Sequence, residues 1–191
     1  PHLYDFRQQK PDPLVPRQLR FEVEERVLYT GEILTPLSDV EVSALIARLQ
    51  AAKVDAVAVC LLHSYAHPVH EQVIGRALRK AMPELQVSLS YDIVPEFKEY
   101  ERMSTTAINA FVGPVMERYL RELQRSTARV GIGSGLHIMQ SNGGTMGADA
   151  AVERPVRAAR SLGRRRGVTV LARSWEPLPR AACFLVGKFP A

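Results

Sequence analysis

Two short segments of the chain carry the side chains best suited to chemistry. The first is residues 94–111, where charged and hydroxyl side chains crowd the start of a helical segment in place of a clean apolar stripe. The second is residues 138–144, an apolar run that ends in a polar, glycine-rich turn. We expect both segments to contribute to one binding site.

The first segment offers two kinds of polar group. Its acids, among them Glu96 and Glu99, could act as acid/base groups or bind Mg²⁺. Acids at a helix start are also stabilised by the helix dipole, by about 0.3–1 kcal/mol each, so a purely structural role stays equally open. Thr105, Thr106 and Asn109 are unusual inside a helix because their side chains compete for backbone hydrogen bonds. This favours a role for them facing a site.

Two interpretations of the turn 141–144 stay open. Gly143 and Gly144 allow backbone N–H groups to approach an anion closely, and Asn142 offers both a donor and an acceptor. The same Asn-Gly pair is also the commonest signal for a tight hairpin turn. No aspartate leads the turn, so we do not assign it as a phosphate loop that holds a metal ion.

Three histidines follow an apolar run, at positions 63, 67 and 70, and Glu71 comes next. These ligand types suit zinc or another divalent ion. The segment crosses from a strand end to a helix start, however, so the spacing does not place all three on one face. We therefore favour capping and loop packing and assign no metal site. Cys60, inside the apolar run, is expected to be a small core residue rather than a nucleophile.

The elements that position these residues predict an α/β fold. Residues 21–29 alternate like a strand, and a capping box at Ser38 starts a helix that should end near Ala52. Residues 54–62 form a β-branched apolar run, which suits a strand buried on both faces, and residues 87–90 alternate as a further strand. Strands separated by helices imply parallel crossover connections.

A long helix is predicted over residues 99–126, followed by a strand over residues 136–140. Pro114 lies inside the helix and removes one backbone donor, so we expect a kink or break near residues 112–113. The buried side of the helix is expected to be formed by its apolar residues: Ile108, Val112, Val115, Tyr119, Leu120 and Leu123.

Composition and charge narrow the class of protein. The 191 residues are 46% hydrophobic and 24% charged, as in a globular protein. The first 153 residues carry 16 Lys and Arg against 19 Asp and Glu, whereas the remainder carries nine against one, so the body has no electrostatic footprint for nucleic acid. No apolar run is long enough to cross a membrane. Two cysteines define no disulfide framework, which fits a cytoplasmic protein.

An ordered set of motifs runs through most of residues 2–157. It comprises Pro13-Leu-Val-Pro-Arg17, residues 56–65, Glu99-Tyr-Glu-Arg102, Met139-Gln-Ser-Asn-Gly-Gly144 and Pro155-Val156. In this order they resemble the hydantoinase A/5-oxoprolinase family. The resemblance implies a fragment of an actin-like, sugar-kinase-like (ribonuclease H-like) ATPase fold.

The resemblance also implies an activity. Members of the family use ATP to open unactivated cyclic amides such as hydantoins and 5-oxoproline, and related members carboxylate ketones. ATP would phosphorylate the amide oxygen, and Mg²⁺ would neutralise the phosphates. Such a subunit often works beside a second, unrelated subunit of the hydantoinase B type, which makes a partner subunit and a small cyclic amide the expected partners, with no nucleic acid or membrane.

The chain departs from the family pattern in two ways. The Asp-x-Gly-Gly-Thr phosphate loops are absent, so we expect an incomplete nucleotide site and no activity from this chain alone. The motifs also stop after Pro155-Val156. We expect residues 1–93 to end an N-terminal α/β lobe, residues 94–160 to begin a second lobe, and residues 161–191 to be a disordered basic tail translated out of frame. The lack of an initiator Met also indicates a piece of a longer protein.

The sequence therefore predicts part of an ATP-dependent hydrolase that opens cyclic amides. The alternatives are a fragment of an ATP-dependent ketone carboxylase subunit and a non-catalytic α/β module that binds a partner. No catalytic residue is assigned. The substrate-side contacts are expected to line one shared cleft, and they are Glu99, Arg102, Thr105, Thr106, Ser141, Asn142, Gly143 and Gly144.

Overall fold

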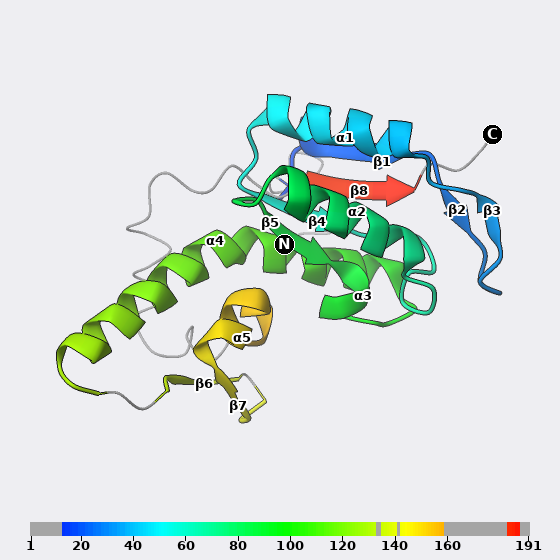
Figure 1. Ribbon diagram of the computed structural model, residues 1–191. Coiled ribbons are helices and arrows are strands. Elements are labelled where there is room, and N and C mark those ends of the chain that lie inside the picture. Colours follow the sequence, from blue (N-terminus) through cyan, green and yellow to red (C-terminus); the bar gives the residue numbers. More distant parts are fainter. Residues whose placement is uncertain (1–12, 133–134, 141, 159–182, 188–191) are drawn as a thin grey trace, which may run out of the picture.

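A four-stranded sheet forms the centre of the molecule. The computed structural model describes residues 13–132, 135–140, 142–158 and 183–187. Within them the strand order is β1 (Arg20–Val23), β8 (Cys183–Gly187), β4 (Ala56–Val59) and β5 (Gln86–Leu89). Each neighbouring pair is parallel (Figure 1). The prediction of an α/β fold with a parallel or mixed sheet and flanking helices is confirmed.

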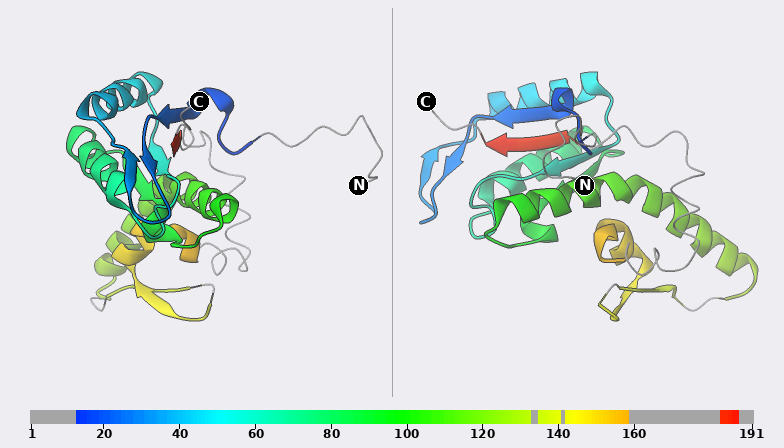
Figure 2. Two further views of the ribbon diagram at one scale, coloured as in Figure 1. Left: turned by 90° about the vertical axis from the view of Figure 1, so that its right-hand side faces the viewer. Right: turned by 180° about the vertical axis from the view of Figure 1, so that it is seen from behind.

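Helices cover both faces of this sheet. Helices α1 (Asp39–Ala52) and α2 (Val69–Ala81) lie on one face, and α4 (Glu99–Arg129) crosses the other (Figure 2). All four residues of β4 are buried, as the apolar run predicts for a strand covered on both sides. A short 3₁₀ helix, η1 (Arg17–Leu19), leads into β1.

The two faces of β4 differ in side-chain size. Val57 and Val59 pack in the core formed with α1 and α2, whereas Ala56 and Ala58 pack with Ala110 of α4. Successive side chains of a strand point to opposite faces, so this alternation puts only small groups beneath α4. The sheet therefore lets the backbone of α4 approach closely.

Helix α1 begins and ends where the sequence predicts. The Ser38 hydroxyl accepts a hydrogen bond from the Glu41 N–H at 3.2 Å, and the helix ends at Ala52. Lys53 follows in the left-handed region, with φ of 50°. The Glu41 carboxylate does not return to Ser38 but accepts a hydrogen bond from the Glu24 N–H, so only half of the capping box forms.

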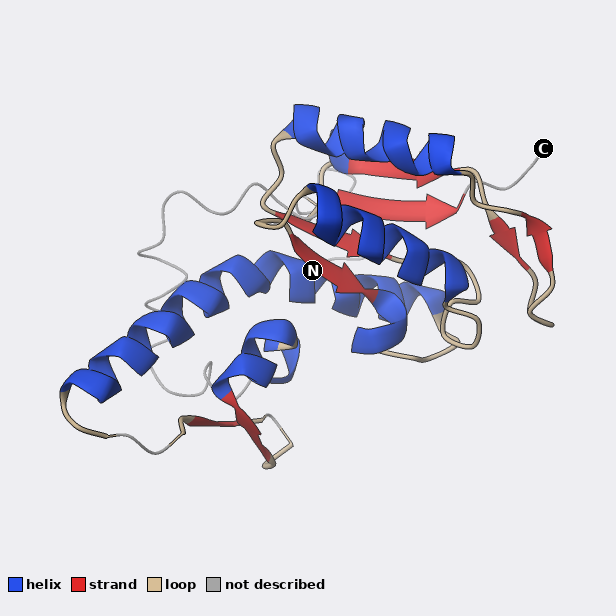
Figure 3. Ribbon diagram, in the orientation of Figure 1, coloured by secondary structure: helices blue, strands red, loops and turns tan. Residues whose placement is uncertain are grey.

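The single strand predicted over residues 21–29 is wrong, because the chain divides there. β1 ends at Val23, and β2 (Arg26–Val27) pairs antiparallel with β3 (Ile33–Thr35) in a hairpin at one end of the central sheet (Figure 3). Glu25, between the two strands, is buried, and its Oε2 lies 2.6 Å from Nδ1 of His70 on α2. This long-range contact fixes the chain where the strand would otherwise continue.

Strand β8 was not expected. Its residues, 183–187, belong to the segment that the sequence assigns to a disordered basic tail, and the structure corrects this for these five residues. The segment Cys-Phe-Leu-Val-Gly is apolar and suits a central strand with a neighbour on each side. Residues 161–182 and 188–191 of the predicted tail lie outside the described residues, so the proposed change of frame stays a prediction.

Helix α4 runs through Pro114 without a break, and the alternative that the sequence predicted, a kink near residues 112–113, stays a prediction. A proline withdraws one N–H and crowds the carbonyl four residues earlier, here that of Ala110, and the packing around the helix tolerates this loss. The expected buried side is also partly wrong, since Ile108 is 43% exposed. The first half of α4 instead turns polar and small residues inward: Arg102, Thr106, Ala107, Asn109, Ala110 and Gly113.

The second half of α4 carries a separate small layer. β6 (His137–Met139) and β7 (Thr145–Gly147) form an antiparallel hairpin, and α5 (Ala148–Glu153) follows it. Ile138 and Ala151 pack there with Met116 and Leu120 of α4, away from the core of the central sheet. In the part of the chain that the structure describes, no helix is long and apolar enough to span a membrane.

Gly113 lies where α4 passes against the side chain of Gln86 on β5. A Cβ at this position would lie 1.9 Å from Oε1 of Gln86, whose Nε2 donates to the Val152 carbonyl at 3.3 Å. We expect Gly113→Ala to lower the free energy of unfolding by roughly 1 kcal/mol, because Gln86 must leave and its hydrogen bond is lost. Urea denaturation would measure this change.

A double-mutant cycle separates this overlap from helix propensity. In a Gln86→Ala background the overlap is gone, and Gly113→Ala should become stabilising by up to about 1 kcal/mol, the propensity difference between the two residues. Equal effects of Gly113→Ala in both backgrounds would show that Gln86 does not require the glycine.

Candidate functional site

The carboxyl ends of β4 and β5 meet at a buried carboxylate. Glu71, in the first turn of α2, is fully buried and accepts hydrogen bonds from the Leu61 N–H at 2.8 Å, the Ser90 hydroxyl at 2.7 Å and the Tyr91 N–H at 3.2 Å. Leu61 follows β4, and Ser90 begins the short helix α3 (Ser90–Ile93) after β5. One side chain thus ties the ends of both strands together.

The carboxyl group of Glu71 is shielded from solvent. Burial raises the pKa of the Glu71 carboxyl group above its usual 4.5, although the hydrogen bonds from Leu61, Ser90 and Tyr91 act in the opposite direction. Burial also raises the pKa of the Cys60 thiol, with Arg102 and Ser90 opposing it. A buried thiol of raised pKa is a poor nucleophile, which supports the expectation that Cys60 is a core residue.

Arg102 is the predicted site residue that this network contains. It is 1% exposed, its Nη2 donates to the Leu61 carbonyl at 2.8 Å, and its guanidinium lies 5.5 Å from the centre of the Tyr65 ring. Its Nε and Nη1 are buried without a hydrogen-bond partner in the described structure. Arg102 therefore lies where a functional arginine would be useful, at the carboxyl ends of parallel strands.

The other predicted residues of α4 divide between surface and interior. Glu99 is exposed and Thr105 is half-buried. Thr106 is fully buried, and its hydroxyl donates to the Arg102 carbonyl at 2.7 Å, a bond within the helix. Asn109, for which the sequence favoured a role facing a site, is also fully buried and forms hydrogen bonds to β5 and to the chain around α5. Thr106 and Asn109 thus act inside the protein.

The glycine-rich turn is the tip of the β6–β7 hairpin. Asn142, Gly143 and Gly144 are exposed, and Ser141 lies outside the described residues. The Gly143 N–H donates to the Gln140 carbonyl at 3.1 Å, and the Gly144 N–H donates to Oδ1 of Asn142 at 3.0 Å. Because these donors are used within the turn, the tight-turn interpretation describes the observed geometry.

The structure does not bring the two predicted groups together. The hairpin is held on the second half of α4 by the apolar cluster that contains Met116 and Leu120, and α5 lies between the hairpin and α4 (Figures 1 and 2). Thr106 and Leu120 are roughly 21 Å apart along the helix at 1.5 Å per residue. The expectation of one shared cleft is therefore wrong, because packed aliphatic groups separate the two segments.

The histidines do not form a metal centre. His70 contacts Glu25, and Nε2 of His67 lies 3.2 Å from the Tyr29 carbonyl oxygen. The described residues contain no group of three His, Cys, Asp or Glu side chains that could hold a metal ion. His63 has φ of 59° and a buried Nδ1 without a partner.

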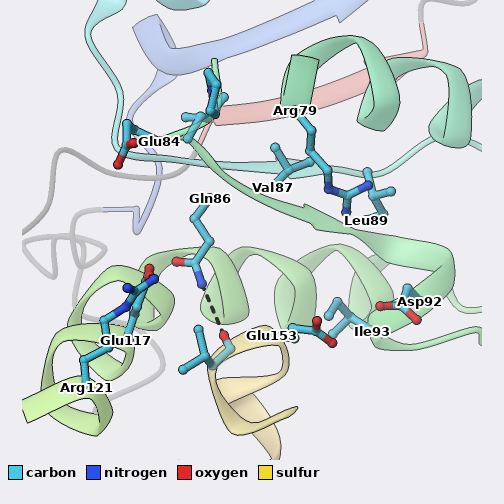
Figure 4. A pocket seen from close by; sticks show the side chains of 13 residues that line it. Arg79, Glu84, Gln86, Val87, Leu89, Asp92, Ile93, Glu117, Arg121 and Glu153 are labelled. Atoms are coloured by element: carbon cyan, nitrogen blue, oxygen red, sulfur yellow. Dashed lines mark hydrogen bonds and ion pairs between the residues drawn. The ribbon is translucent and has the colours of Figure 1, made fainter. Parts of the chain in front are cut away.

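A polar cavity of about 560 Å³ lies between the free edge of β5 and the helices below it (Figure 4). Gln86 crosses it to reach the Val152 carbonyl, and Glu117 and Arg121 pair with each other along one wall. Sequence analysis missed this cavity because its walls come from segments far apart in the chain, and no local pattern connects them. It contains none of the predicted site residues.

The residues present do not complete a site for ATP. The backbone donors of Gly143 and Gly144 already have partners, and the described residues offer no cluster of metal ligands for Mg²⁺.

Comparisons with known proteins agree with the sequence motifs. Residues 1–82 match the family model of the hydantoinase/oxoprolinase N-terminal region, and residues 102–184 match the hydantoinase/oxoprolinase model. An uncharacterized protein of Methanocaldococcus jannaschii is 39% identical over 155 residues, which are 81% of this chain and 23% of that protein. Caprolactamase subunit alpha of Pseudomonas jessenii is 33% identical over 160 residues, which are 84% of this chain and 23% of the subunit.

Solved structures show the same relationship. The crystal structure of ATP-dependent caprolactamase from Pseudomonas jessenii matches 91% of this chain and 26% of its own, with a TM-score of 0.73 and 29% identity. The nucleotide-free structure of acetone carboxylase matches 86% of this chain and 24% of its own, with a TM-score of 0.67 and 25% identity. The predicted fold, part of an actin-like ATPase fold, is confirmed.

The chain spans about a quarter of the length of these relatives. The sequence motifs, both family models and the structural matches agree with one another. The chain belongs to the hydantoinase/oxoprolinase family.

Proposed function

We propose that this chain is a segment of an ATP-dependent enzyme that opens cyclic amides. The observation that carries the proposal is the agreement in sequence and in structure with a caprolactamase described as ATP-dependent. Cyclic amides are unreactive, and phosphorylation of the amide oxygen by ATP would activate the amide carbon towards water, so that the C–N bond can break and the nitrogen takes up a proton. The whole activity belongs to the longer protein, because the chain spans about a quarter of its relatives.

Within such an enzyme the segment has a positioning role. The Glu71 network fixes the ends of β4 and β5, and Arg102 and Asn109 attach α4 to those ends. We propose that Glu99 and Thr105 contact substrate from the first turns of α4. We propose that Asn142, Gly143 and Gly144 contact substrate only in a site that parts of the protein beyond this chain help to form.

The proposal extends to cofactor, partner and location. Relatives are named as subunits, such as caprolactamase subunit alpha and acetone carboxylase beta subunit, which supports assembly with a second subunit. We propose a hydantoinase B-type partner, Mg²⁺ as the companion of ATP, and a cytoplasmic location. We propose that the metal and phosphate contacts come from outside the described residues, among which no group of three His, Cys, Asp or Glu side chains could hold a metal ion.

The test uses the full-length protein with any subunit that copurifies. ATP hydrolysis would be measured with caprolactam, hydantoin, 5-oxoproline and, separately, acetone with bicarbonate. We expect a cyclic amide to stimulate phosphate release with matching formation of the ring-opened acid. Stimulation by none of the cyclic amides would overturn the proposal.

The similarity to acetone carboxylase favours a second candidate, an ATP-dependent ketone carboxylase. It predicts phosphate release only when ketone and bicarbonate are both present. A non-catalytic module that binds a partner would show neither response, and calorimetry with ATP on the full-length protein would show no nucleotide binding.

A further inference from the structure

We propose that Arg102 and His63 form a binding site for a small oxyanion, a carboxylate or a phosphate, beneath Tyr65 at the carboxyl ends of β4 and β5. This site is assigned from contacts and burial alone. It does not rest on the proposed activity, because it requires neither ATP turnover nor an amide substrate.

The guanidinium group of Arg102 carries a positive charge in the interior of the protein. A guanidinium stays protonated in proteins, and a buried charge is expensive unless it is paired and hydrogen-bonded. Arg102 is 1% exposed, and its Nη2 donates a hydrogen bond to the Leu61 carbonyl. In the described structure Nε and Nη1 are buried and have no hydrogen-bond partner. An oxyanion would satisfy both N–H groups and the charge.

The second argument is His63, whose backbone is strained. Its φ of 59° lies in the left-handed region that few non-glycine residues occupy, and such strain gathers at binding sites. Its Nδ1 is buried and has no hydrogen-bond partner among the described residues, and its ring meets the Tyr65 ring edge-on at 6.3 Å between centroids. Tyr65 also lies over Arg102. The two unsatisfied side chains therefore share one aromatic neighbour.

The third argument is the surrounding charge. Among the groups that act electrostatically on His63 are the cations Arg26 and Arg102 and the carboxylate of Glu99. The turn that holds His63 and Tyr65 follows β4 directly, and ligands of open α/β sheets bind beyond the carboxyl ends of the strands. Charge and position both favour an anion.

Tyr65 covers the site and is itself half-buried on the turn after β4. The Nε and Nη1 atoms of Arg102 are buried in the described structure. Binding therefore requires the Tyr65 ring to move outward, and a carboxylate or phosphate would replace part of its contact with Arg102.

The experiment observes the arginine Nε–H signals of the ¹⁵N-labelled chain by NMR. Sodium acetate and sodium phosphate are titrated separately, with sodium chloride holding the ionic strength constant. We expect one arginine signal, absent from Arg102→Lys, to shift saturably. Saturation by acetate alone identifies a carboxylate site, saturation by phosphate alone identifies a phosphate site, and saturation by both identifies a general oxyanion site.

Two variants and a control test the assignment. Followed by the backbone amide signal of Tyr65, Arg102→Lys should weaken binding by roughly tenfold or more, because charged hydrogen bonds are lost. His63→Asn, whose side chain tolerates the left-handed region, should keep the fold and weaken binding several-fold. Arg118→Met, at an exposed position of α4, should bind as the wild type does. Unsaturable shifts with both anions, or unchanged affinity in His63→Asn, would overturn the site.

Discussion

Replacing Glu71 with alanine is expected to lower the free energy of unfolding by about 3 kcal/mol or more. The carboxylate accepts hydrogen bonds from the Leu61 N–H, the Ser90 hydroxyl and the Tyr91 N–H, and all three donors would lose this partner. Removal also leaves a cavity at the junction of β4, β5 and α2. Urea denaturation of the chain would measure the change, with Glu101→Ala as the control.

The control is matched because Glu101 is an exposed glutamate, and its replacement should alter stability by less than about 0.5 kcal/mol. Similar small losses in both variants would mean that the Glu71 network does not hold the two strand ends. A loss confined to Glu71→Ala is the result that the hydrogen-bond geometry predicts.

The raised pKa of Glu71 gives this position a defined pH dependence. Because the folded protein holds the proton more tightly than the unfolded chain, the contribution of Glu71 to stability is fully present below pH 4.5. It declines as the pH rises above that value and through the raised pKa of the folded state. Glu71→Gln, which carries no charge, should remove this decline, as urea midpoints measured across the pH range would reveal.

Local features of the fold were predictable from sequence because their causes are local. Ser38 caps α1 through a neighbour three residues away, and the β-branched run around Val57 needs two covered faces whatever covers them. The periodicity predicted an α/β fold, and the family motifs predicted more narrowly a part of an actin-like ATPase fold. Strand β8 escaped prediction because its apolar residues lie within a strongly basic segment.

The candidate site was harder to predict because its contacts join distant segments. The sequence singled out Arg102, whose role in a site stays a prediction, but it could not reveal the contact of Glu71 with Ser90, which forms only after α2 packs on the sheet. Polar residues such as Thr106 suggested a surface turned toward ligand. They are instead buried. The small side chains of Ala56 and Ala58 allow α4 to lie close to the sheet, where its polar side chains form hydrogen bonds with backbone groups and hydroxyls.

Asn109 gives the clearest test of whether the polar side chains of α4 hold this helix on the sheet. Its Nδ2 donates to the Ser88 hydroxyl at 3.0 Å and to the Glu153 carbonyl at 3.4 Å, and its Oδ1 accepts the Val156 N–H at 3.2 Å. We expect Asn109→Ala to lower the free energy of unfolding by about 2–4 kcal/mol, because buried groups on β5 and beyond α5 lose their partners. Asn142→Ala is the matched control in urea denaturation, since this exposed asparagine serves only its own turn and should cost well under 1 kcal/mol. Equal losses in the two variants would contradict a buried role for Asn109, whereas a large loss only at Asn109 would establish that α4 is fastened to the sheet by polar contacts.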